Sequence, residues 1–506
     1  MSNLVDVLLI NPGDRKRIFQ DLGDEFVSVE PPVFAGLFAT YLRKKGLSIA
    51  IIDAPAMELS TKDVAKEAVM LNPILVVIVV YGAQPSASTQ NMTSAYEIAE
   101  WIKGTSTMGG PIQIMMTGTH PAALPEQTLR GGNRETNVGK ASVVDFVCDL
   151  EGPETIYKTV QVLKNGGDNF SSVPSLWWRT GPDMMWSPKE SEPLIQDLDV
   201  AMSGIAWDLL PMDKYRSHNW HSFDHISEQS PYASIHMSLG CPYKCHFCCI
   251  NAPFGAARYR MWSPEQVLKE IDYLAREHGV VNLKFVDEMF VLNPNHVLEI
   301  CRLLVEREYD VNIWAYARVD TVRDEFLGPL KSAGVNWLCL GIESASQYVR
   351  DGVEKKYGNE DIIDVVRRIQ DAGIYVIGNF IFGLPDDTLP RMQETLNLAL
   401  ELNCEYANFY SAMAYPGSPL YKQAVKDGRE LPDKWEDYSQ HGYGTKPLAN
   451  EYCTSAEILR FRDRAHQRYF RNRSYLDMVK RKFGQDVVNH IGRMVQIPLR
   501  RKLLGT

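Results

Sequence analysis

The sequence has no long hydrophobic run. Its most apolar stretch, residues 74–81, is far shorter than the ~20 residues that a membrane-spanning helix requires, so we expect no transmembrane segment. The first six residues show no basic region followed by an apolar one, so we also expect no secretory signal. A block of basic residues is missing too, and the net charge is −10, which argues against a nucleic-acid partner.

Cysteine is too sparse for a disulfide-stabilised scaffold. The chain has nine cysteines in 506 residues, and together with the missing signal this number favours a reducing compartment, the cytoplasm. Five stand alone, and we expect them to be small buried hydrophobic side chains: Cys148, Cys301, Cys339, Cys404 and Cys453. The other four lie within nine residues, a density that packing does not explain: Cys241, Cys245, Cys248 and Cys249.

The apolar residues that are present suffice for several cores. Hydrophobic residues make up 45% and charged residues 23% of the chain, which is typical of a globular protein. The length predicts about three domains. We predict two α/β domains, a connector between them and a helical C-terminal domain, with boundaries at residues 1–165, 166–230, 231–425 and 426–506.

Strand and helix patterns alternate through the first of these domains. Helical patterns separate five short apolar runs, at residues 5–11, 47–52, 73–81, 112–116 and 143–148. This alternation predicts a doubly wound parallel sheet of the Rossmann-like or flavodoxin-like kind. Ligands of such sheets bind at the carboxyl ends of the strands, which selects the loops at residues 11–14, 81–86 and 117–121.

The segment from residue 166 to 230 loses this alternation. It holds five of the ten tryptophans, whereas a free linker would be poor in aromatic residues. We therefore expect a Trp-rich connector that packs across a domain interface, with a hairpin at residues 173–186. Just before it, residues 130–140 are polar and Gly-rich, and we expect an exposed insertion there.

The alternation then returns six times. The strands are expected at residues 233–238, 282–286, 311–316, 337–341, 375–381 and 406–413, and the helices at 264–277, 294–307, 324–333, 360–372 and 389–402. Six units are too few for an eightfold barrel, so we predict a partial (β/α)6 barrel that resembles a TIM barrel. The charged tail from residue 426 is expected to be a solvated helical cap rather than a partner-binding surface.

The cysteine cluster directly follows the first barrel strand. Cys241, Cys245 and Cys248 have the spacing C-x3-C-x2-C, and thiolates select zinc or iron–sulfur clusters. Structural zinc requires four ligands, but the side chain of Cys249 would point away from that of Cys248, and His246 is the other candidate. A [4Fe–4S] cluster held by three cysteines instead leaves one iron open for a small ligand.

The run from Ser238 to Cys248, with Phe247 just before the last cysteine, resembles the signature of the radical S-adenosylmethionine (SAM) superfamily. The resemblance implies that the three cysteines hold a [4Fe–4S] cluster, that SAM chelates its fourth iron, and that reductive cleavage of SAM gives a 5′-deoxyadenosyl radical. Structural zinc and a simple electron-transfer cluster are the alternatives. Cys249 is expected to be a spare buried thiol.

The same resemblance assigns SAM contacts to later strand ends. An acidic residue after the second barrel strand, Glu288 or Asp287, would bind the SAM ammonium group, and Arg318 would pair with its carboxylate. The full set of implied SAM-binding residues is Phe247, Asp287, Glu288, Arg318, Glu343, Ser344, Asn379 and Ile381. A turn or cap is the alternative role for the acidic pair, and a surface ion pair for Arg318.

A five-stranded doubly wound sheet ahead of such a barrel resembles the cobalamin-binding (B12-binding) subclass. The resemblance implies cobalamin contacts in the three strand-end loops, at Asn11, Pro12, Gly82, Ser86, Thr117, Gly118, Thr119 and His120. Many cobalamin domains carry a cobalt-ligating histidine after the first strand, but residues 13–18 contain none. His120 lies on a different loop and is expected to be a hydrogen-bonding loop residue, so the lower cobalt ligand is left open.

These resemblances predict a cobalamin-dependent radical SAM methyltransferase. It would move a methyl group from methylcobalamin to an unactivated carbon or a phosphorus of a small molecule, after hydrogen abstraction. An external electron donor such as flavodoxin or ferredoxin is implied. The alternatives are a cobalamin-dependent cyclase or rearrangement enzyme, a radical SAM enzyme whose first domain binds no corrinoid, and a metal-stabilised binding protein.

Overall fold

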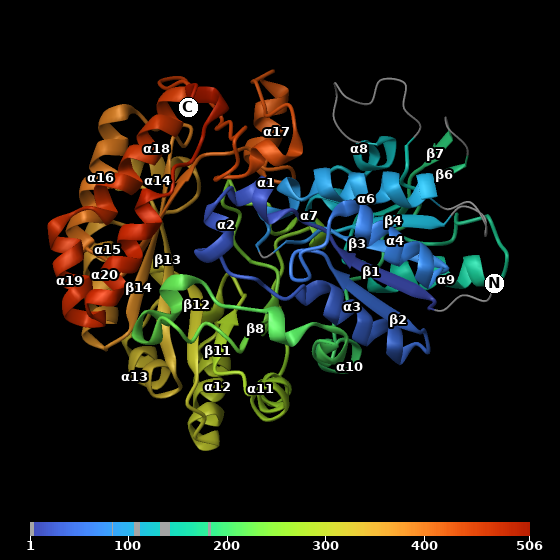
Figure 1. The fold of residues 1–506 in the computed structure, drawn as a ribbon, viewed down its shortest axis with the longest axis horizontal. Helices are drawn as coiled ribbons and strands as arrows, with labels where there is room; N and C mark the ends of the chain where they lie inside the picture. Colours follow the sequence, from blue (N-terminus) through green and yellow to red (C-terminus); the bar gives the residue numbers. More distant parts are fainter. Residues whose placement is uncertain (1–4, 83, 106–111, 132–141, 181–183) are drawn as a thin grey trace.

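Two large, mainly parallel sheets lie side by side, one in each half of the molecule (Figure 1). The computed structural model describes residues 5–82, 84–105, 112–131, 142–180 and 184–506. The predicted insertion at residues 130–140 therefore lies mostly outside the described residues. Within the described part, no helix is long and apolar enough to cross a bilayer.

The first sheet has the strand order β2-β1-β3-β4-β5-β6-β7. Its parallel strands are β1 (Val7–Asn11), β2 (Ile49–Asp53), β3 (Leu75–Val79), β4 (Gln113–Thr117) and β5 (Phe146–Cys148). Helices cover both faces: α3 (Val33–Lys44), α4 (Thr61–Leu71), α5 (Ala87–Gln90), α6 (Met92–Thr105), α7 (Thr119–Ala123), α8 (Pro125–Arg130) and α9 (Pro153–Lys164). Because side chains alternate along a strand, Leu9 and Val77 pack on one face and Leu8 and Ile78 on the other. The predicted fold class is confirmed.

The prediction of five strands is short by two. The sheet continues with β6 (Leu176–Thr180) and β7 (Met184–Trp186), which form the expected hairpin and pair antiparallel. The three-residue strand β5 would otherwise leave an open edge, which the aromatic strand β6 covers. Trp177 Nε1 donates a hydrogen bond to Asp149 at 2.9 Å, so part of the predicted connector is fixed to this sheet.

Six parallel strands form the second sheet, in the order β15-β14-β13-β12-β11-β8, as predicted for a partial barrel. They are β8 (Tyr232–Ile235), β11 (Asn282–Phe285), β12 (Asn312–Arg318), β13 (Val335–Glu343), β14 (Tyr375–Phe382) and β15 (Tyr406–Ser411). The helices outside it are α11 (Pro264–His278), α12 (Pro294–Arg307), α13 (Asp324–Ser332), α14 (Gln347–Gly352), α15 (Asn359–Asp371) and α16 (Leu389–Leu402). Local signals explain their starts, since Ser263 and Asn293 each cap a helix whose first residue is proline.

The C-terminal tail packs against β15, the last strand of the barrel, instead of forming a solvated cap. Its helices are α18 (Ser455–Phe470), α19 (Arg473–Phe483) and α20 (Gln485–Gln496), which follow α17 (Pro419–Lys426) (Figure 1). Tyr469 and Tyr475 donate hydrogen bonds to the carbonyl oxygens of Cys404 and Glu405, next to the edge strand β15. Arg462 is buried and donates to the carbonyl oxygen of Phe409 at 2.7 Å.

A segment of the first half completes the barrel. Residues 15–31, here called the plug segment, contain α1 (Arg15–Phe19) and α2 (Leu22–Glu25) and lie between the two halves (Figure 1). On one side Glu30 accepts hydrogen bonds from Tyr232 and Ser234 of β8 and pairs with Lys284 of β11. On the other side the ring of Phe26 lies 4.9 Å from that of His490 in α20. The plug segment thus spans the gap that six strands leave open.

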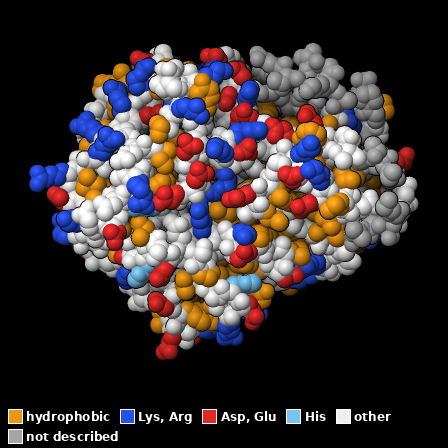
Figure 2. Space-filling model, in the orientation of Figure 1, with side chains coloured by type: hydrophobic (Ala, Val, Ile, Leu, Met, Phe, Trp, Pro, Cys, Tyr) orange, Lys and Arg blue, Asp and Glu red, His pale blue; other side chains and the backbone are white. Residues whose placement is uncertain are grey.

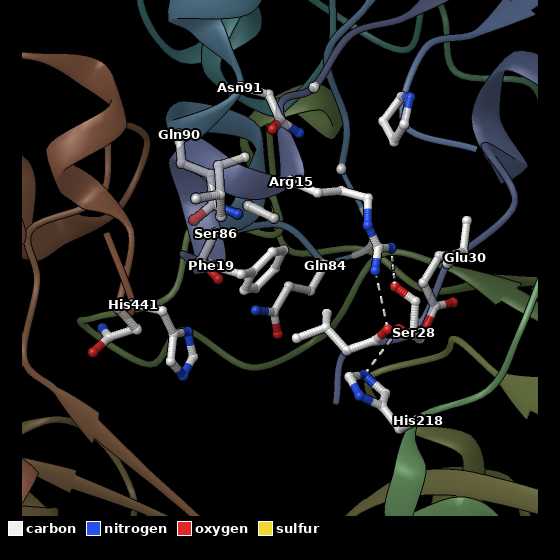
Figure 3. Close-up of a pocket in the computed structure, with 18 of the residues that line it drawn as sticks. Arg15, Phe19, Ser28, Glu30, Gln84, Ser86, Gln90, Asn91, His218 and His441 are labelled. Atoms are coloured by element: carbon white, nitrogen blue, oxygen red, sulfur yellow. Dashed lines mark hydrogen bonds between the residues drawn. The ribbon is translucent and has the colours of Figure 1, made fainter. Parts of the chain in front are cut away.

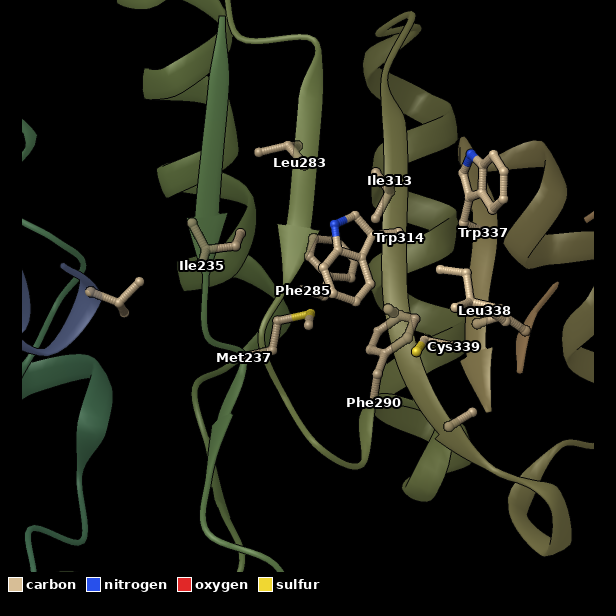
Figure 4. Packing of buried hydrophobic residues seen from close by; sticks show 14 of the residues in the cluster. Ile235, Met237, Leu283, Phe285, Phe290, Ile313, Trp314, Trp337, Leu338 and Cys339 are labelled. Carbon is tan, nitrogen blue, oxygen red and sulfur yellow. The ribbon is translucent and has the colours of Figure 1, made fainter. Parts of the chain in front are cut away.

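Buried aromatic residues pack at the amino-terminal ends of the barrel strands, where Figure 4 shows Trp314 and Trp337. The ring of Trp220, from the predicted connector, lies 5.0 Å from Trp314 and 5.5 Å from Trp337. Burial of such large rings gives the two halves one continuous core. On the outside, basic and acidic side chains are interspersed over the face that Figure 2 shows.

Candidate active site

The cysteine loop leaves the barrel at β9 (Ser238–Leu239), which pairs with β10 (Arg260–Met261). Gly240 turns the chain with φ +84°, and a side chain there would collide with the carbonyl oxygen of Arg258. Asn251 accepts a hydrogen bond from the Cys241 amide and donates one to the Tyr243 carbonyl, which holds the two ends of the loop together. The loop is therefore shaped by the turn at Gly240 and by the side chain of Asn251.

Cys241, Cys245 and Cys248 line one cavity of about 230 Å³, which we call the cysteine cavity. Burial raises the pKa of the Cys241 thiol to about 11, so its thiolate needs a nearby positive charge such as that of a metal centre. No three His, Cys, Asp or Glu side chains in the described ranges lie close enough together to hold a single metal ion. A cluster of four irons and four sulfides is wider than one ion, and three thiols that border a shared cavity fit it.

The two acidic residues after β11 have different surroundings in the structure. Asp287 is buried and accepts hydrogen bonds from the amide of Met237 (2.9 Å) and the hydroxyl of Ser238, so it fixes the start of the cysteine loop. Glu288 lines the cysteine cavity, and burial raises its pKa to about 7. Of the two predicted SAM-binding carboxylates, Glu288 is the one that lines this cavity.

Glu343 and Lys355 form a buried ion pair at the end of β13. The Lys355 Nζ lies 2.5 Å from Glu343 Oε1, and both side chains are 7% exposed. Although burial disfavours its charge, the Glu343 carboxylate raises the pKa of Lys355. Glu343 has φ +65°, a strained value for a residue other than glycine, and such strain concentrates at functional sites.

Sequence reasoning did not single out Lys355. It stands in the run Glu354-Lys355-Lys356, which looks like an ordinary solvated charge run. The available signal was the hydrophobic residue Val353, which immediately precedes this charge run and is buried in the structure. Ser344, by contrast, is fully buried, lies near the hydroxyl of Thr395 at 3.2 Å, and is not among the residues that line the cysteine cavity.

Arg318 ends β12 beside the cysteine loop. Its Nε and Nη2 each donate to the carboxylate of Asp320 at 2.9 Å, and its Nη1 donates to Cys245 Sγ at 3.5 Å. In this structure the carboxylate bound by the guanidinium is therefore that of Asp320. Whether this arginine also contacts the carboxylate of SAM stays a prediction.

Three further predicted residues line the cysteine cavity: Phe247, Asn379 and Ile381. Phe247 packs against the buried hydrophobic cluster that contains Ile381, and the two residues give the cavity an apolar wall. Asn379 donates to Cys339 Sγ at 3.0 Å and accepts from Asn408 at 2.9 Å, so its amide is held by side chains of β13 and β15.

A second cavity, of about 280 Å³, lies at the strand ends of the first sheet and continues into the barrel (Figure 3). We call it the domain cavity. Asn11, Pro12, Gly82 and Ser86 line it, together with the plug segment and with Trp314 and Tyr410 of the barrel. Arg15 of the plug segment donates to the carbonyl oxygen of Ser28 at 2.7 Å, and His218 lies near the Ser28 hydroxyl.

Side chains from both halves separate the two cavities. Ser86, Tyr316, Tyr410 and Gln440 line both. Gln84 lines these two and also a smaller cavity of about 50 Å³, which Thr119, His236 and Glu288 share. The sequence pointed to the loop at residues 81–86, but it gave no signal for Tyr316, Tyr410 or Gln440, because strand phase and the path of the tail are tertiary properties.

Three predicted cobalamin contacts are not among the residues that line these cavities: Thr117, Gly118 and His120. His120 is 1% exposed, its ring lies 4.5 Å from that of Trp435, and burial lowers its pKa to about 3. Gly118 has φ +134°, and a side chain there would collide with the carbonyl oxygen of Val80. Thr117, Gly118 and His120 therefore support the loop at residues 117–121 without lining these cavities.

The sequence of this chain is similar to those of known proteins. Residues 235–399 match the sequence profile of the radical SAM superfamily. An uncharacterized methyltransferase of Pyrococcus horikoshii is 28% identical over 436 residues, which cover 86% of this chain and 86% of that protein. The anaerobic magnesium-protoporphyrin IX monomethyl ester cyclase of Rubrivivax gelatinosus is 25% identical over 478 residues, which are 93% of this chain and 78% of the cyclase.

A solved structure shares the fold across both halves. It is the radical S-adenosylmethionine methyltransferase TsrM of Kitasatospora setae, with cobalamin and a [4Fe–4S] cluster bound. The TM-score is 0.60 at 18% sequence identity, covering 85% of this chain and 76% of that one. The matched profile spans the cysteine loop and the ends of β8 and β11 to β14, which carry the site. Residues 235–399 of this chain therefore form a radical SAM domain.

Proposed function

We propose that the protein is a cobalamin-dependent radical SAM methyltransferase that acts on a small molecule. The observation that carries the proposal is the composition of the cysteine cavity. The three thiols share it with Glu288, with the Glu343–Lys355 pair and with Gln84 and Ser86 of the first domain. When bound, the cluster and SAM supply a radical that abstracts a hydrogen atom, and cobalamin supplies the methyl group.

The chain's own residues bind and orient these groups. Cys241, Cys245 and Cys248 would hold the cluster, and an ionised Glu288 would accept a hydrogen bond from the amino group of SAM. Lys355 fixes the Glu343 carboxylate, which faces the cavity at a strained backbone position. Phe247 and Ile381 provide an apolar wall that excludes water.

Cobalamin binds at the carboxyl edge of the first sheet. Asn11, Pro12, Gly82 and Ser86 line the domain cavity there, and Asn11 is held by a 2.8 Å hydrogen bond from its amide to Asp53. Thr117, Gly118 and His120 set the backbone of the neighbouring loop. His120 is not a cobalt ligand in this proposal, because its ring packs on Trp435 and Thr89 instead of the cavity.

An external one-electron donor of the flavodoxin or ferredoxin class would supply the electron that the cluster needs. The cytoplasm is the compartment that suits such a donor and the nine free cysteines of the described chain. The predicted domain boundaries, at residues 165, 230 and 425, remain part of the proposal.

Cofactor content is the first test. The protein is purified without oxygen from cells supplied with iron and cobalamin, and iron, sulfide, cobalt and zinc are measured on one sample. We expect about four irons per chain, as for a single cubane cluster, and cobalt in proportion to the protein. Zinc in place of iron, or the absence of cobalt after reconstitution with hydroxocobalamin, would contradict the proposal.

A cyclase is the second candidate, because the magnesium-protoporphyrin relative aligns with 93% of this chain. The products of SAM distinguish the two. A methyltransferase of this type forms S-adenosylhomocysteine along with 5′-deoxyadenosine, whereas a cyclase forms 5′-deoxyadenosine alone. Chromatography of the reaction therefore decides between them once a substrate has been found.

A further inference from the structure

A buried arginine contacts the cysteine loop at two points. Arg318 is 6% exposed, and its Nη1 donates to Cys245 Sγ at 3.5 Å. Its guanidinium carbon also lies 4.0 Å from the centre of the Tyr243 ring, and Tyr243 stands between the first two cysteines. The arginine therefore faces the loop with one donor directed at a sulfur atom and its flat side against an aromatic ring.

The other donors of this guanidinium fix its orientation. Nε and Nη2 each donate to Asp320, a bidentate pair that holds the plane of the group. Thr321 fixes the backbone, since its hydroxyl accepts from the amide of Arg318 at 3.2 Å and donates to the carbonyl of the same residue at 2.9 Å. The N–H that points at Cys245 is thus held in place from both sides.

We propose that Arg318 raises the reduction potential of the iron–sulfur cluster through its hydrogen bond to Cys245, with Asp320 as the residue that positions it. The inference rests on the proposed function, because it requires the cluster on these cysteines. It gives Arg318 a role that differs from binding the SAM carboxylate, since the carboxylate in its fork is that of Asp320.

The physical reason is charge. On reduction, the cluster accepts one electron from the external donor, and no bond of the protein forms or breaks. The negative charge that it gains is spread over iron, sulfide and the cysteine sulfurs. A hydrogen bond to one of these sulfurs stabilises the reduced form more than the oxidised form, which makes the potential less negative. Low exposure strengthens this effect, because little water screens it.

The test measures the potential of the cluster and not the activity of the enzyme. Wild type, Arg318→Gln, Arg318→Lys and Arg323→Gln are prepared without oxygen, and their iron and sulfide contents are matched. Each is titrated with dithionite in the absence of SAM, and the reduced cluster is followed by electron paramagnetic resonance. Arg323→Gln is the matched control, because it removes the same charge from an exposed position. The side chain of Arg323 is 59% exposed and pairs with Glu325.

We expect a more negative potential in Arg318→Gln, a smaller change in the same direction in Arg318→Lys, and none in Arg323→Gln. An unchanged or less negative potential in Arg318→Gln, at equal iron content, overturns the proposal. If Arg318→Gln does not retain the cluster, Arg318→Lys decides by the same criterion. Loss of the cluster from both variants, with an unchanged melting temperature, assigns Arg318 to cluster retention and overturns the redox role.

Failure of the proposed function has a different signature. If wild type holds no iron–sulfur cluster after reconstitution, the enzyme assignment fails before any potential is measured. If wild type holds the cluster and the variants titrate like it, the assignment stands and the role of Arg318 falls.

Discussion

The site has two sides, which are built by different means. One is formed by the carboxyl ends of the barrel strands, here called the barrel edge, and the other by the carboxyl ends of the strands in the first sheet, here called the first-sheet edge. At the barrel edge, charged side chains are buried and paired, as in Glu343–Lys355 and Arg318–Asp320. At the first-sheet edge, turns and glycines dominate, and the one histidine of the predicted contact set packs away from the cavity. The difference indicates that the barrel edge orients ligands by charge, whereas the first-sheet edge presents a surface shaped by backbone.

The largest effect expected at the barrel edge comes from the cysteines. Replacing Cys241, Cys245 and Cys248 together with alanine should abolish both iron binding and SAM cleavage, because no thiolate ligand of the loop's motif remains. Iron analysis and chromatography of 5′-deoxyadenosine measure this. Cys249→Ala is the matched control, since that buried thiol adjoins the motif. Loss of the cluster in Cys249→Ala would contradict the ligand assignment.

The buried pair at the same edge gives the next largest effect. Lys355→Met leaves Glu343 buried without its partner, which costs about 3–5 kcal/mol of unfolding free energy in comparable cases. The double variant Lys355→Met, Glu343→Gln should recover part of this loss, because no buried charge is left. Denaturant unfolding measures both. Equal stabilities of the single and double variants would show that the pair is not coupled.

Glu288 makes the barrel edge sensitive to pH. Its pKa of about 7 exceeds the ordinary value, so the folded chain holds a proton that the unfolded chain loses between pH 4.5 and 7. The free energy of unfolding contributed by this group therefore falls as pH rises through that range. Glu288→Gln should be more stable than wild type at pH 8, by on the order of 1–3 kcal/mol, and similar to it at pH 4.

The same titration should appear in SAM binding. Below pH 7 the protonated Glu288 loses the charge that attracts the amino group, so affinity should fall by up to about tenfold per pH unit. Calorimetry on the cluster-loaded protein measures the dependence, and Glu288→Gln should remove it. Glu306→Gln is the control, since that side chain is 53% exposed. A pH profile of Glu288→Gln that matches wild type would remove Glu288 from the site.

The smallest effect is expected at the first-sheet edge. His120→Asn should leave the cobalt content of the reconstituted protein unchanged, because the ring lies against Trp435 and Thr89. A lowered melting temperature is the expected consequence, since a buried ring contact is lost. Cobalt analysis together with the visible spectrum of bound cobalamin checks this. Loss of cobalt would place His120 among the ligands and reverse the comparison.

Local signals in the sequence predicted most of the fold. The helices at Pro294–Arg307 and Leu389–Leu402 lie where they were expected, because caps, prolines and apolar spacing are encoded within a few residues. Strands β6 and β7 were missed as members of the first sheet, since pairing with β5 is a tertiary property.

The candidate site was predictable where a motif is contiguous. The cysteines stand in one short run, whereas Lys355 meets Glu343 only after the chain has turned through α14. The burial of Arg462 in the charged tail was unpredictable for a related reason. Its partners, the Phe409 carbonyl and Asp463, hold it against β15, and no local pattern distinguishes it from solvated arginines.

The plug segment also sets a limit on how this protein can be taken apart. Glu30 reaches the side chains of Tyr232, Ser234 and Lys284, so residues 202 to 254 positions later depend on the start of the chain for hydrogen bonds. A radical SAM domain cut out at its profile boundaries would lack most of β8 and all of β15, and it would leave Lys284 without the Glu30 carboxylate. In this chain the segment that matches the radical SAM profile is smaller than the unit of folding. Domain exchange between relatives should therefore carry residues 15–31 along with the barrel.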